Sequence, residues 1–144
     1  MKCILYVCTG NTCRSPMAQG LTMQYAKENG LDLLAISAGI FPEGERISEN
    51  AAQVLSEEGI DMSFHKPRKL NQTDIDKADI VVCMSKQHAY AIVSIFPAAA
   101  DKIKIMGKNG IPDPYGGDYN LYKTCMLEIK NQIPRLVIDL LEVK

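Results

Sequence analysis

The sequence lacks the features that several classes of protein require. Its 16 basic and 17 acidic residues give a net charge of −1, so there is no positive footprint for nucleic acid. Its longest apolar runs, such as residues 80–84, are far too short to span a bilayer, and no signal-peptide cleavage site follows the apolar start. We therefore expect a cytoplasmic protein that binds neither nucleic acid nor membrane.

Histidine is scarce, and closely spaced cysteine pairs of the CxxC type are missing. The two histidines, His65 and His88, lie far in sequence from every cysteine. The five cysteines are Cys3, Cys8, Cys13, Cys83 and Cys125. A secreted disulfide framework usually has an even number of cysteines, and a structural zinc site needs closely spaced ligands. We expect reduced, mostly buried thiols and neither a metal nor another cofactor.

The chain has the length of one ordinary domain, and we predict a single domain over residues 1–144. Strand-like segments at residues 2–7, 33–37, 80–84 and 102–106 alternate with helix-like segments at residues 15–29, 48–58, 71–77, 85–95 and 118–141. This alternation predicts an α/β fold: a doubly wound, flavodoxin-like, four-stranded parallel sheet with helices on both faces. Ser15 is the expected N-cap of the first helix, with Pro16 as its first residue, and Pro134 is expected to disturb the last helix.

The segment between the first strand and the first helix is suited to bind an anion. A helix N-terminus that follows a strand collects backbone N–H groups and the positive end of the helix dipole. Gly10 is expected to permit a turn that most residues resist, and Asn11 tolerates the left-handed region. The planar fork of Arg14 can hold two phosphoryl oxygens at once. Ligands of parallel sheets bind at this carboxyl edge.

Cys8 opens this anion-binding segment. A thiol beside a helix N-terminus and an arginine is expected to exist largely as thiolate, placed for in-line attack on phosphorus. Ser15 is well placed to hydrogen-bond that sulfur and help it leave in a second step. The alternative interpretation is a plain anion-binding turn that contains a spectator cysteine.

Asp113 is the candidate acid for the leaving group. Pro112 and Pro114 restrict the backbone on both sides of it, and it follows the fourth predicted strand, whose end should lie at the same edge as Cys8. A protonated Asp113 would donate to the leaving atom and then, as carboxylate, activate water. The alternative is that Asp113-Pro114 is only turn chemistry.

With these residues the sequence resembles the low-molecular-weight protein tyrosine phosphatases. The resemblance rests on the following segments: Cys8–Ser15 with Pro16, Ser37-Ala38-Gly39, His65-Lys66 with Arg68, Cys83-Met84, and Asp113-Pro114-Tyr115. It implies Cys8 as nucleophile, Arg14 as phosphate clamp and Asp113 as general acid. It further implies a phosphate-binding loop that includes Thr9, Gly10, Asn11, Thr12, Cys13 and Ser15. It makes Ser37 a residue that braces the loop and His65 a residue that supports Asn11 from behind.

Position 12 bears on the substrate. Many tyrosine phosphatases of the family have isoleucine there, whereas Thr12 resembles the bacterial branch of protein arginine phosphatases. A small polar side chain could position water and leave room for a planar guanidinium beside Asp113, on which Tyr115 could stack. We therefore expect a phosphorylated protein as substrate and favour phosphoarginine, with phosphotyrosine as the alternative.

Other readings of the sequence stay open. A thioredoxin-coupled arsenate reductase shares the fold and loop type, but it needs a resolving thiol near the third strand, and Cys83 has no cysteine partner nearby. A non-catalytic phosphoprotein-binding module would keep the loop without needing a thiolate or an acid. Cys8 and Cys13 lie close enough in sequence for a reversible protective disulfide. We expect a monomer or weak self-association.

Overall fold

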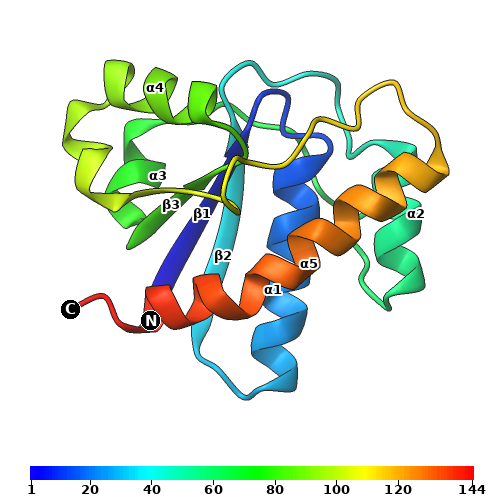
Figure 1. The fold of residues 1–144 in the computed structure, drawn as a ribbon, viewed down its shortest axis with the longest axis horizontal. Coiled ribbons are helices and arrows are strands. Elements are labelled where there is room, and N and C mark those ends of the chain that lie inside the picture. The colour runs from blue at the N-terminus through cyan, green and yellow to red at the C-terminus, as the bar shows by residue number, and fades with distance from the viewer.

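The computed structural model describes all residues, 1–144, arranged around one parallel sheet. Its strands are β1 (Lys2–Cys8), β2 (Leu33–Gly39), β3 (Ile80–Cys83) and β4 (Ile103–Ile105), in the order β2-β1-β3-β4 (Figure 1). The helices are α1 (Arg14–Glu28), α2 (Glu49–Glu57), α3 (Gln72–Lys77), α4 (Lys86–Ile95) and α5 (Tyr119–Leu141), with a 3₁₀ helix at Pro97–Lys102 that the sequence did not predict. The predicted doubly wound four-stranded parallel sheet is confirmed.

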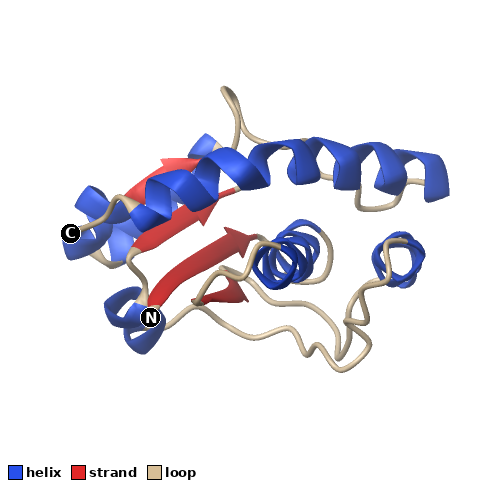
Figure 2. Cartoon of the chain, turned by 90° about the horizontal axis from the view of Figure 1, so that it is seen from below, coloured by secondary structure: helices blue, strands red, loops and turns tan.

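The sheet separates two apolar cores because successive side chains of a strand point to opposite faces. Ile4 and Tyr6 join the larger core with α1, α2 and α5, whereas Leu5 and Val7 join the smaller one with α3 and α4. Figure 2, in which α1 and α2 are seen nearly end-on, shows α5 running above both of them. Because alternate side chains of β1 enter two different cores, the register of β1 is fixed, and so is the place where that strand ends.

The carboxyl ends of β1 and β3 meet where the strand order reverses. Val7 pairs with Cys83, so the segments that follow both strands leave from the same edge. Cys8 pairs with Gly39, where an added Cβ would lie only 2.7 Å from the carbonyl oxygen of Thr9. Glycine at position 39 thus lets β2 pass directly behind the segment that follows Cys8.

Two details of the predicted helices are wrong. Helix α1 begins at Arg14 with Cys13 at its N-cap position, so Ser15 does not cap the helix and Pro16 is not its first residue. Helix α5 continues through Pro134. Pro134 lies on the exposed side of α5, where water can satisfy the backbone carbonyl that a proline leaves without a partner. No helix has the length and apolar character needed to cross a membrane.

Candidate active site

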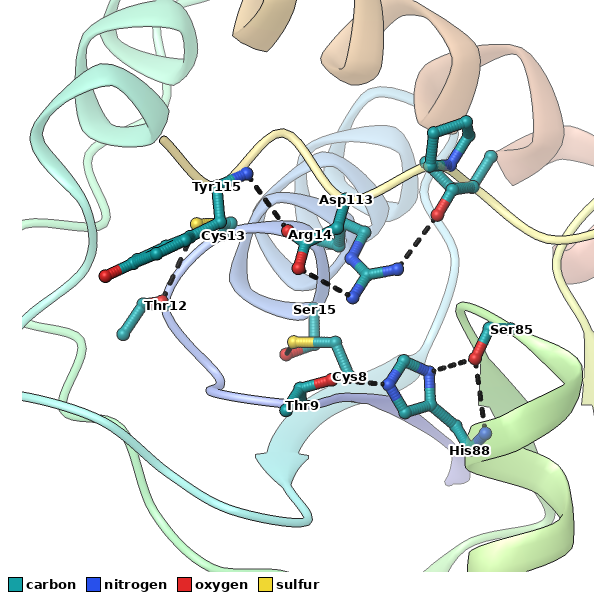
Figure 3. A network of polar contacts seen from close by, with 12 residues as sticks. Cys8, Thr9, Thr12, Cys13, Arg14, Ser15, Ser85, His88, Asp113 and Tyr115 are labelled. Carbon is teal, nitrogen blue, oxygen red and sulfur yellow. Dashed lines mark hydrogen bonds and ion pairs between the residues drawn. The ribbon is translucent and has the colours of Figure 1, made fainter. Parts of the chain in front are cut away.

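The phosphate loop, Cys8–Ser15, encloses a small cavity at the carboxyl end of β1 (Figure 3). The cavity has a volume of about 90 Å³. Its lining comes from three segments of the chain: Cys8, Thr9, Gly10, Thr12, Cys13 and Arg14, then Glu43, then Asp113 and Tyr115. Eight of the ten residues expected to be catalytic or to form the loop and pocket, including Cys8, Arg14 and Asp113, therefore lie around one space, and the other two, Asn11 and Ser15, are buried beside it.

Arg14 favours the binding of an anion in this cavity. The residue is 5% exposed, and its Nε–H is buried without a hydrogen-bond partner. Its Nη1 donates to the Ile111 carbonyl at 2.9 Å, and its Nη2 lies 3.6 Å from Oδ2 of Asp113. An unpaired buried donor is costly, so a bound anion that accepts from Nε would relieve a real penalty.

The sulfur of Cys8 faces a hydroxyl that is free to donate. Ser15 Oγ lies 2.9 Å from Cys8 Sγ and accepts a hydrogen bond from Asn11 Nδ2 at 2.8 Å. Because the amide supplies its own proton to Ser15 Oγ, the serine proton remains for the sulfur. This contact explains why Ser15 is turned into the site instead of capping α1.

Asn11, and not Gly10, makes the turn of the phosphate loop. Asn11 has φ 57°, the one non-glycine residue in the left-handed region, whereas Gly10 does not have a positive φ. An added Cβ at Gly10 would meet nothing closer than 3.4 Å. The expectation that Gly10 provides the special backbone conformation is therefore wrong, and an asparagine side chain that tolerates this region provides it.

Two surrounding segments, strand β2 and the loop between α2 and α3, hold Asn11 in place. Its Oδ1 accepts from the Arg68 backbone at 3.1 Å, and its Nδ2 donates to Ser37 Oγ at 3.1 Å. His65 Nε2 lies 2.8 Å from the Asn11 carbonyl oxygen. Burial lowers the pKa of His65, which favours a neutral ring that donates its Nε2–H to this carbonyl. Both Ser37 and His65 thus lie where the family resemblance placed them.

Asp113 reaches the cavity from the acid loop, residues 107–118. The Ile111 backbone N–H donates to the Met84 carbonyl at 2.8 Å, which ties this loop to the end of β3. Asp113 Oδ1 accepts from the Tyr115 backbone at 3.1 Å, and half of the Asp113 side chain is exposed. The carboxyl group therefore borders both the cavity and solvent.

Glu43 is a lining residue that sequence reasoning missed. It follows β2, whose carboxyl end lies at the same edge as that of β1, and its backbone N–H donates to the Gly10 carbonyl at 3.1 Å. The only sequence signal was its place after a parallel strand. Glu43 and Asp113 are the two carboxyl residues that line the cavity, and Asp113 is the one that lies within 4 Å of Arg14.

His88 is a second missed residue. Its Nε2 lies 2.8 Å from Thr9 Oγ1, and its Nδ1 lies 2.9 Å from Ser85 Oγ (Figure 3). The side chain belongs to α4, and its first-turn position after β3 was the one signal available. Burial, aided by the Arg14 charge and opposed by Asp113, lowers the pKa of His88 to about 4.

The remaining thiols are buried and unpaired, as expected. Burial raises the pKa of both Cys83 and Cys125 to about 12, so neither is a ready thiolate for a redox relay. Cys13 Sγ lies 3.2 Å from the hydroxyl of Tyr122. Tyr122 is itself buried, with its pKa raised to about 12 by burial and by this contact, and it is not an accessible phosphorylation target in the folded state.

The arrangement brings together a sulfur nucleophile, an unpaired cationic donor and a carboxyl group. The helix dipole of α1 and Arg14 would stabilise negative charge in the cavity, next to Cys8 Sγ. Asp113 is placed at the mouth, where a leaving group would emerge. Such a site is suited to transfer a dianionic group to sulfur and then to water.

Comparison with known proteins agrees with this chemistry. The family model described as low molecular weight phosphotyrosine protein phosphatase matches residues 3–144. The chain is 41% identical over 140 residues to a protein-arginine-phosphatase of Geobacillus stearothermophilus, covering 92% of each chain. It is 38% identical over 133 residues to the low molecular weight protein-tyrosine-phosphatase Ptp of Acinetobacter johnsonii, covering 90% of this chain and 91% of the relative.

Solved structures give the same picture. The low molecular weight protein tyrosine phosphatase of T. tengcongensis superposes with a TM-score of 0.92 at 40% identity, covering 97% of this chain and 100% of the other. The YwlE arginine phosphatase of Geobacillus stearothermophilus superposes with a TM-score of 0.87 at 36% identity, covering 98% and 94%. Both kinds of relative therefore share the whole fold of this chain.

Proposed function

Because the chain belongs to the low molecular weight phosphotyrosine protein phosphatase family, we propose that it hydrolyses phosphoarginine in proteins through a cysteinyl phosphate on Cys8. The observation that carries this proposal is the buried, unpaired Nε–H of Arg14 in a cavity that also contains Cys8 and Asp113. The cavity is suited to bind a dianion, and the Cys8 sulfur lies where that dianion would bind.

In the first step, Cys8 Sγ attacks phosphorus as the bond from phosphorus to the guanidine nitrogen breaks. Asp113 donates its proton to that nitrogen, so the leaving group departs as an intact arginine side chain. Arg14 and the backbone N–H groups of the loop hold the three non-bridging phosphoryl oxygens throughout. Cysteinyl phosphate and a carboxylate at position 113 remain.

In the second step, water enters from the exposed side of Asp113. The carboxylate takes a proton from this water as its oxygen bonds to phosphorus, and the bond from phosphorus to sulfur breaks. The hydroxyl of Ser15, already aimed at Cys8 Sγ, stabilises the departing thiolate. Inorganic phosphate leaves, and Asp113 is protonated again for the next turnover.

The rim of the cavity supports an arginine substrate. Glu43 and Asp113 are carboxyl groups that suit a cationic guanidinium, and Thr12 leaves more polar room than an isoleucine would. Figure 3 shows the Tyr115 ring extending on the same side of the site as Thr12, where it could stack on a planar group. The similarity to proteins named protein-arginine-phosphatase adds support. Phosphotyrosine is the alternative, supported by the relatives with that name.

The substrate is tested with matched phosphoarginine and phosphotyrosine peptides. We expect the wild type to have the higher kcat/KM on phosphoarginine, and Thr12→Ile to shift the ratio of the two kcat/KM values toward phosphotyrosine. Thr73→Ile, on the exposed surface of α3, is the matched control. A wild type that prefers phosphotyrosine, with a ratio that Thr12→Ile does not change, would refute the choice of phosphoarginine.

The reaction itself is tested with Cys8→Ser. This variant should lose activity on every phosphomonoester and on phosphoarginine while keeping its affinity for inorganic phosphate within a few fold. Equal turnover by the variant and the wild type would refute the cysteinyl-phosphate route. A wild type that binds phosphate but hydrolyses nothing would instead favour the non-catalytic binding module.

We also propose that the protein works as a monomer in the cytoplasm. A thiol nucleophile with a second thiol in the same loop needs a reducing compartment to stay active. Light scattering at micromolar concentration tests the monomer, and fractionation of the source cells tests the location. A stable dimer, or recovery in an oxidising compartment, would contradict these two proposals respectively.

A further inference from the structure

Thr9 and His88 form a contact beside the nucleophile that the two-step reaction does not use. Thr9 follows Cys8 directly, lines the cavity and is exposed toward it. His88 is buried, at 7% exposure, and its two ring nitrogens contact Thr9 Oγ1 and Ser85 Oγ. The first turn of α4 is thereby joined to the first turn of the phosphate loop, across a gap of 79 positions in the sequence.

Counting protons assigns the direction of this chain of hydrogen bonds. Ser85 is the N-cap of α4, and its Oγ accepts the backbone N–H of His88 at 3.2 Å. The hydroxyl proton of Ser85 is therefore free to be donated to His88 Nδ1, 2.9 Å away. A neutral ring that accepts at Nδ1 carries its hydrogen on Nε2, and it donates that hydrogen to Thr9 Oγ1.

The surroundings of His88 favour the neutral ring. Burial lowers the pKa of His88 to about 4. The positive charge of Arg14 adds to this effect, and the negative charge of Asp113 opposes it. A neutral donor can approach Thr9 without adding a second cation beside the Arg14 guanidinium. Near pH 7 the chain of hydrogen bonds therefore runs from Ser85 through His88 to Thr9.

We propose that His88 is a positioning residue that, by donating to Thr9 Oγ1, leaves the Thr9 hydroxyl proton free to bond a phosphoryl oxygen in the cavity. Because the imidazole supplies the hydrogen of this contact, the Thr9 hydroxyl proton is not needed for it and can be donated to an acceptor in the space that Thr9 lines. The identity of the anion as a phosphoryl group rests on the proposed function.

Affinity for inorganic phosphate tests this role without any turnover, by calorimetry at pH 7. Thr9→Val removes the hydroxyl at nearly constant shape and should weaken phosphate binding about tenfold, the effect of one hydrogen bond to a charged group. His88→Leu should weaken it by a similar factor. The double variant should also lose about tenfold, because both substitutions act on the same hydrogen bond from Thr9 to the phosphate.

Three further measurements separate positioning from mere stabilisation. Thr9→Ser and His88→Gln, which keep a hydroxyl and a side-chain N–H, should bind phosphate within about threefold of the wild type. On a peptide substrate, Thr9→Val should raise KM and leave kcat nearly unchanged, because the lost bond acts on bound substrate and transition state alike. Nitrogen NMR of the free protein should find the hydrogen of His88 on Nε2.

The proposal is overturned by any of three results. These are unchanged phosphate affinity in Thr9→Val, losses that multiply to about a hundredfold in the double variant, or a His88 hydrogen on Nδ1. Thr9 is exposed, so its substitution tests the idea even if His88→Leu folds poorly. Tyr90→Leu, at an exposed position of the same helix, is the control and should change nothing. The phosphate affinities decide the role of His88 even if the wild type hydrolyses neither substrate, a result that would refute the proposed function alone.

Discussion

The phosphate loop and the acid loop face the same cavity but are held in opposite ways. In the phosphate loop, Cys8, Asn11, Arg14 and Ser15 are all buried, and the Ser37 and His65 side chains and the Arg68 backbone fix the one left-handed residue. In the acid loop, Asp113 is half exposed, Tyr115 is 71% exposed, and backbone bonds near Ile111 and Tyr115 carry most of the attachment.

This difference matches what each loop would have to do. Binding a dianion needs donors that are already in place before the substrate arrives, because reorganising them would cost free energy at the moment of reaction. A residue that exchanges a proton with a leaving group and then with water must be reachable from solvent. A buried phosphate loop and a solvent-exposed acid loop can coexist because they follow separate strands, β1 and β4, of one sheet.

Substitution of the acid should produce the largest effect and should leave the phosphate loop intact. Asp113→Asn is expected to lower kcat about 10³-fold on a substrate with a poor leaving group, the range typical of general acid–base catalysis. Affinity for phosphate should change by less than about threefold, and Asp32→Asn, at an exposed position outside the cavity lining, is the matched control. A loss of kcat below tenfold would contradict the acid role.

Substitution inside the phosphate loop should instead lower both stability and activity. Asn11→Ala places alanine in a left-handed conformation and leaves partners on Ser15, Ser37 and Arg68 unpaired. We expect the free energy of unfolding to fall by about 3 kcal/mol, and kcat/KM to fall roughly 10- to 100-fold. Chemical denaturation and steady-state kinetics measure the two losses.

Asn131→Ala, an exposed change on α5, serves as the control for Asn11→Ala and should lie within about 0.5 kcal/mol of the wild type. If Asn11→Ala lowers activity without lowering stability, the side-chain hydrogen bonds of Asn11 do not hold the phosphate loop together, and the contrast between the two loops is wrong.

Low pH should destabilise the protein through the two histidines that contact the phosphate loop. Folding lowers the pKa of His88 to about 4 and lowers that of His65, so between pH 6.5 and 4 the unfolded state binds more protons. Their contribution to stability is therefore complete above about pH 6.5 and is lost as the pH falls toward 4. We expect His88 alone to account for about 2 kcal/mol of this loss between pH 7 and pH 4.5.

Urea unfolding at both pH values checks the sign and size of this dependence. The charged neighbours are Arg14 and Asp113 for His88, and Arg68 for His65. Wild type and His88→Gln contain the same three charged residues, so the difference between the two proteins isolates His88. The glutamine variant should show a smaller fall in stability than the wild type, and an equal fall would rule out His88 as its source.

The smallest effect is expected at the rim of the acid loop. Tyr115→Ala should raise KM for a phosphoarginine peptide about two- to fivefold, because stacking at an exposed site is worth only about 0.5–1 kcal/mol. Tyr115→Phe should keep the wild-type value. Parallel assays of the two variants make this check, and a drop in kcat beyond about tenfold would show that Tyr115 does more than the contrast between the loops allows.

How much of the site the sequence predicts depends on how local the cause is. Cys8, Arg14 and Asp113, which line one cavity, could be predicted to act together because Cys8 and Arg14 lie in one short segment and two prolines flank Asp113. Glu43, which lines the cavity, and His88, which contacts Thr9, were missed because each belongs to a segment that follows a different strand from β1. His65 was placed through the family resemblance, since nothing near it in the chain points to Asn11.

Local rules also gave wrong answers where tertiary contacts compete with them. Serine before proline is a good helix start, but the Ser15 hydroxyl is drawn to Asn11 Nδ2 and the Cys8 sulfur, so Cys13 occupies the N-cap position. Glycine is the usual residue for a left-handed turn, but several partners hold Asn11 there instead. In both cases the hydrogen bonds of a buried polar side chain outweigh a local preference.

The sequence by itself determined the parallel α/β sheet and predicted that Cys8, Arg14 and Asp113 share one site, because strand–helix alternation and short motifs are local properties. Only the tertiary structure decided which hydroxyl faces the sulfur, which residue makes the turn, that Glu43 borders the cavity and that His88 contacts Thr9. The physical reason is that hydrogen-bond direction and charge proximity depend on separations in space, which the order of residues along a chain does not contain.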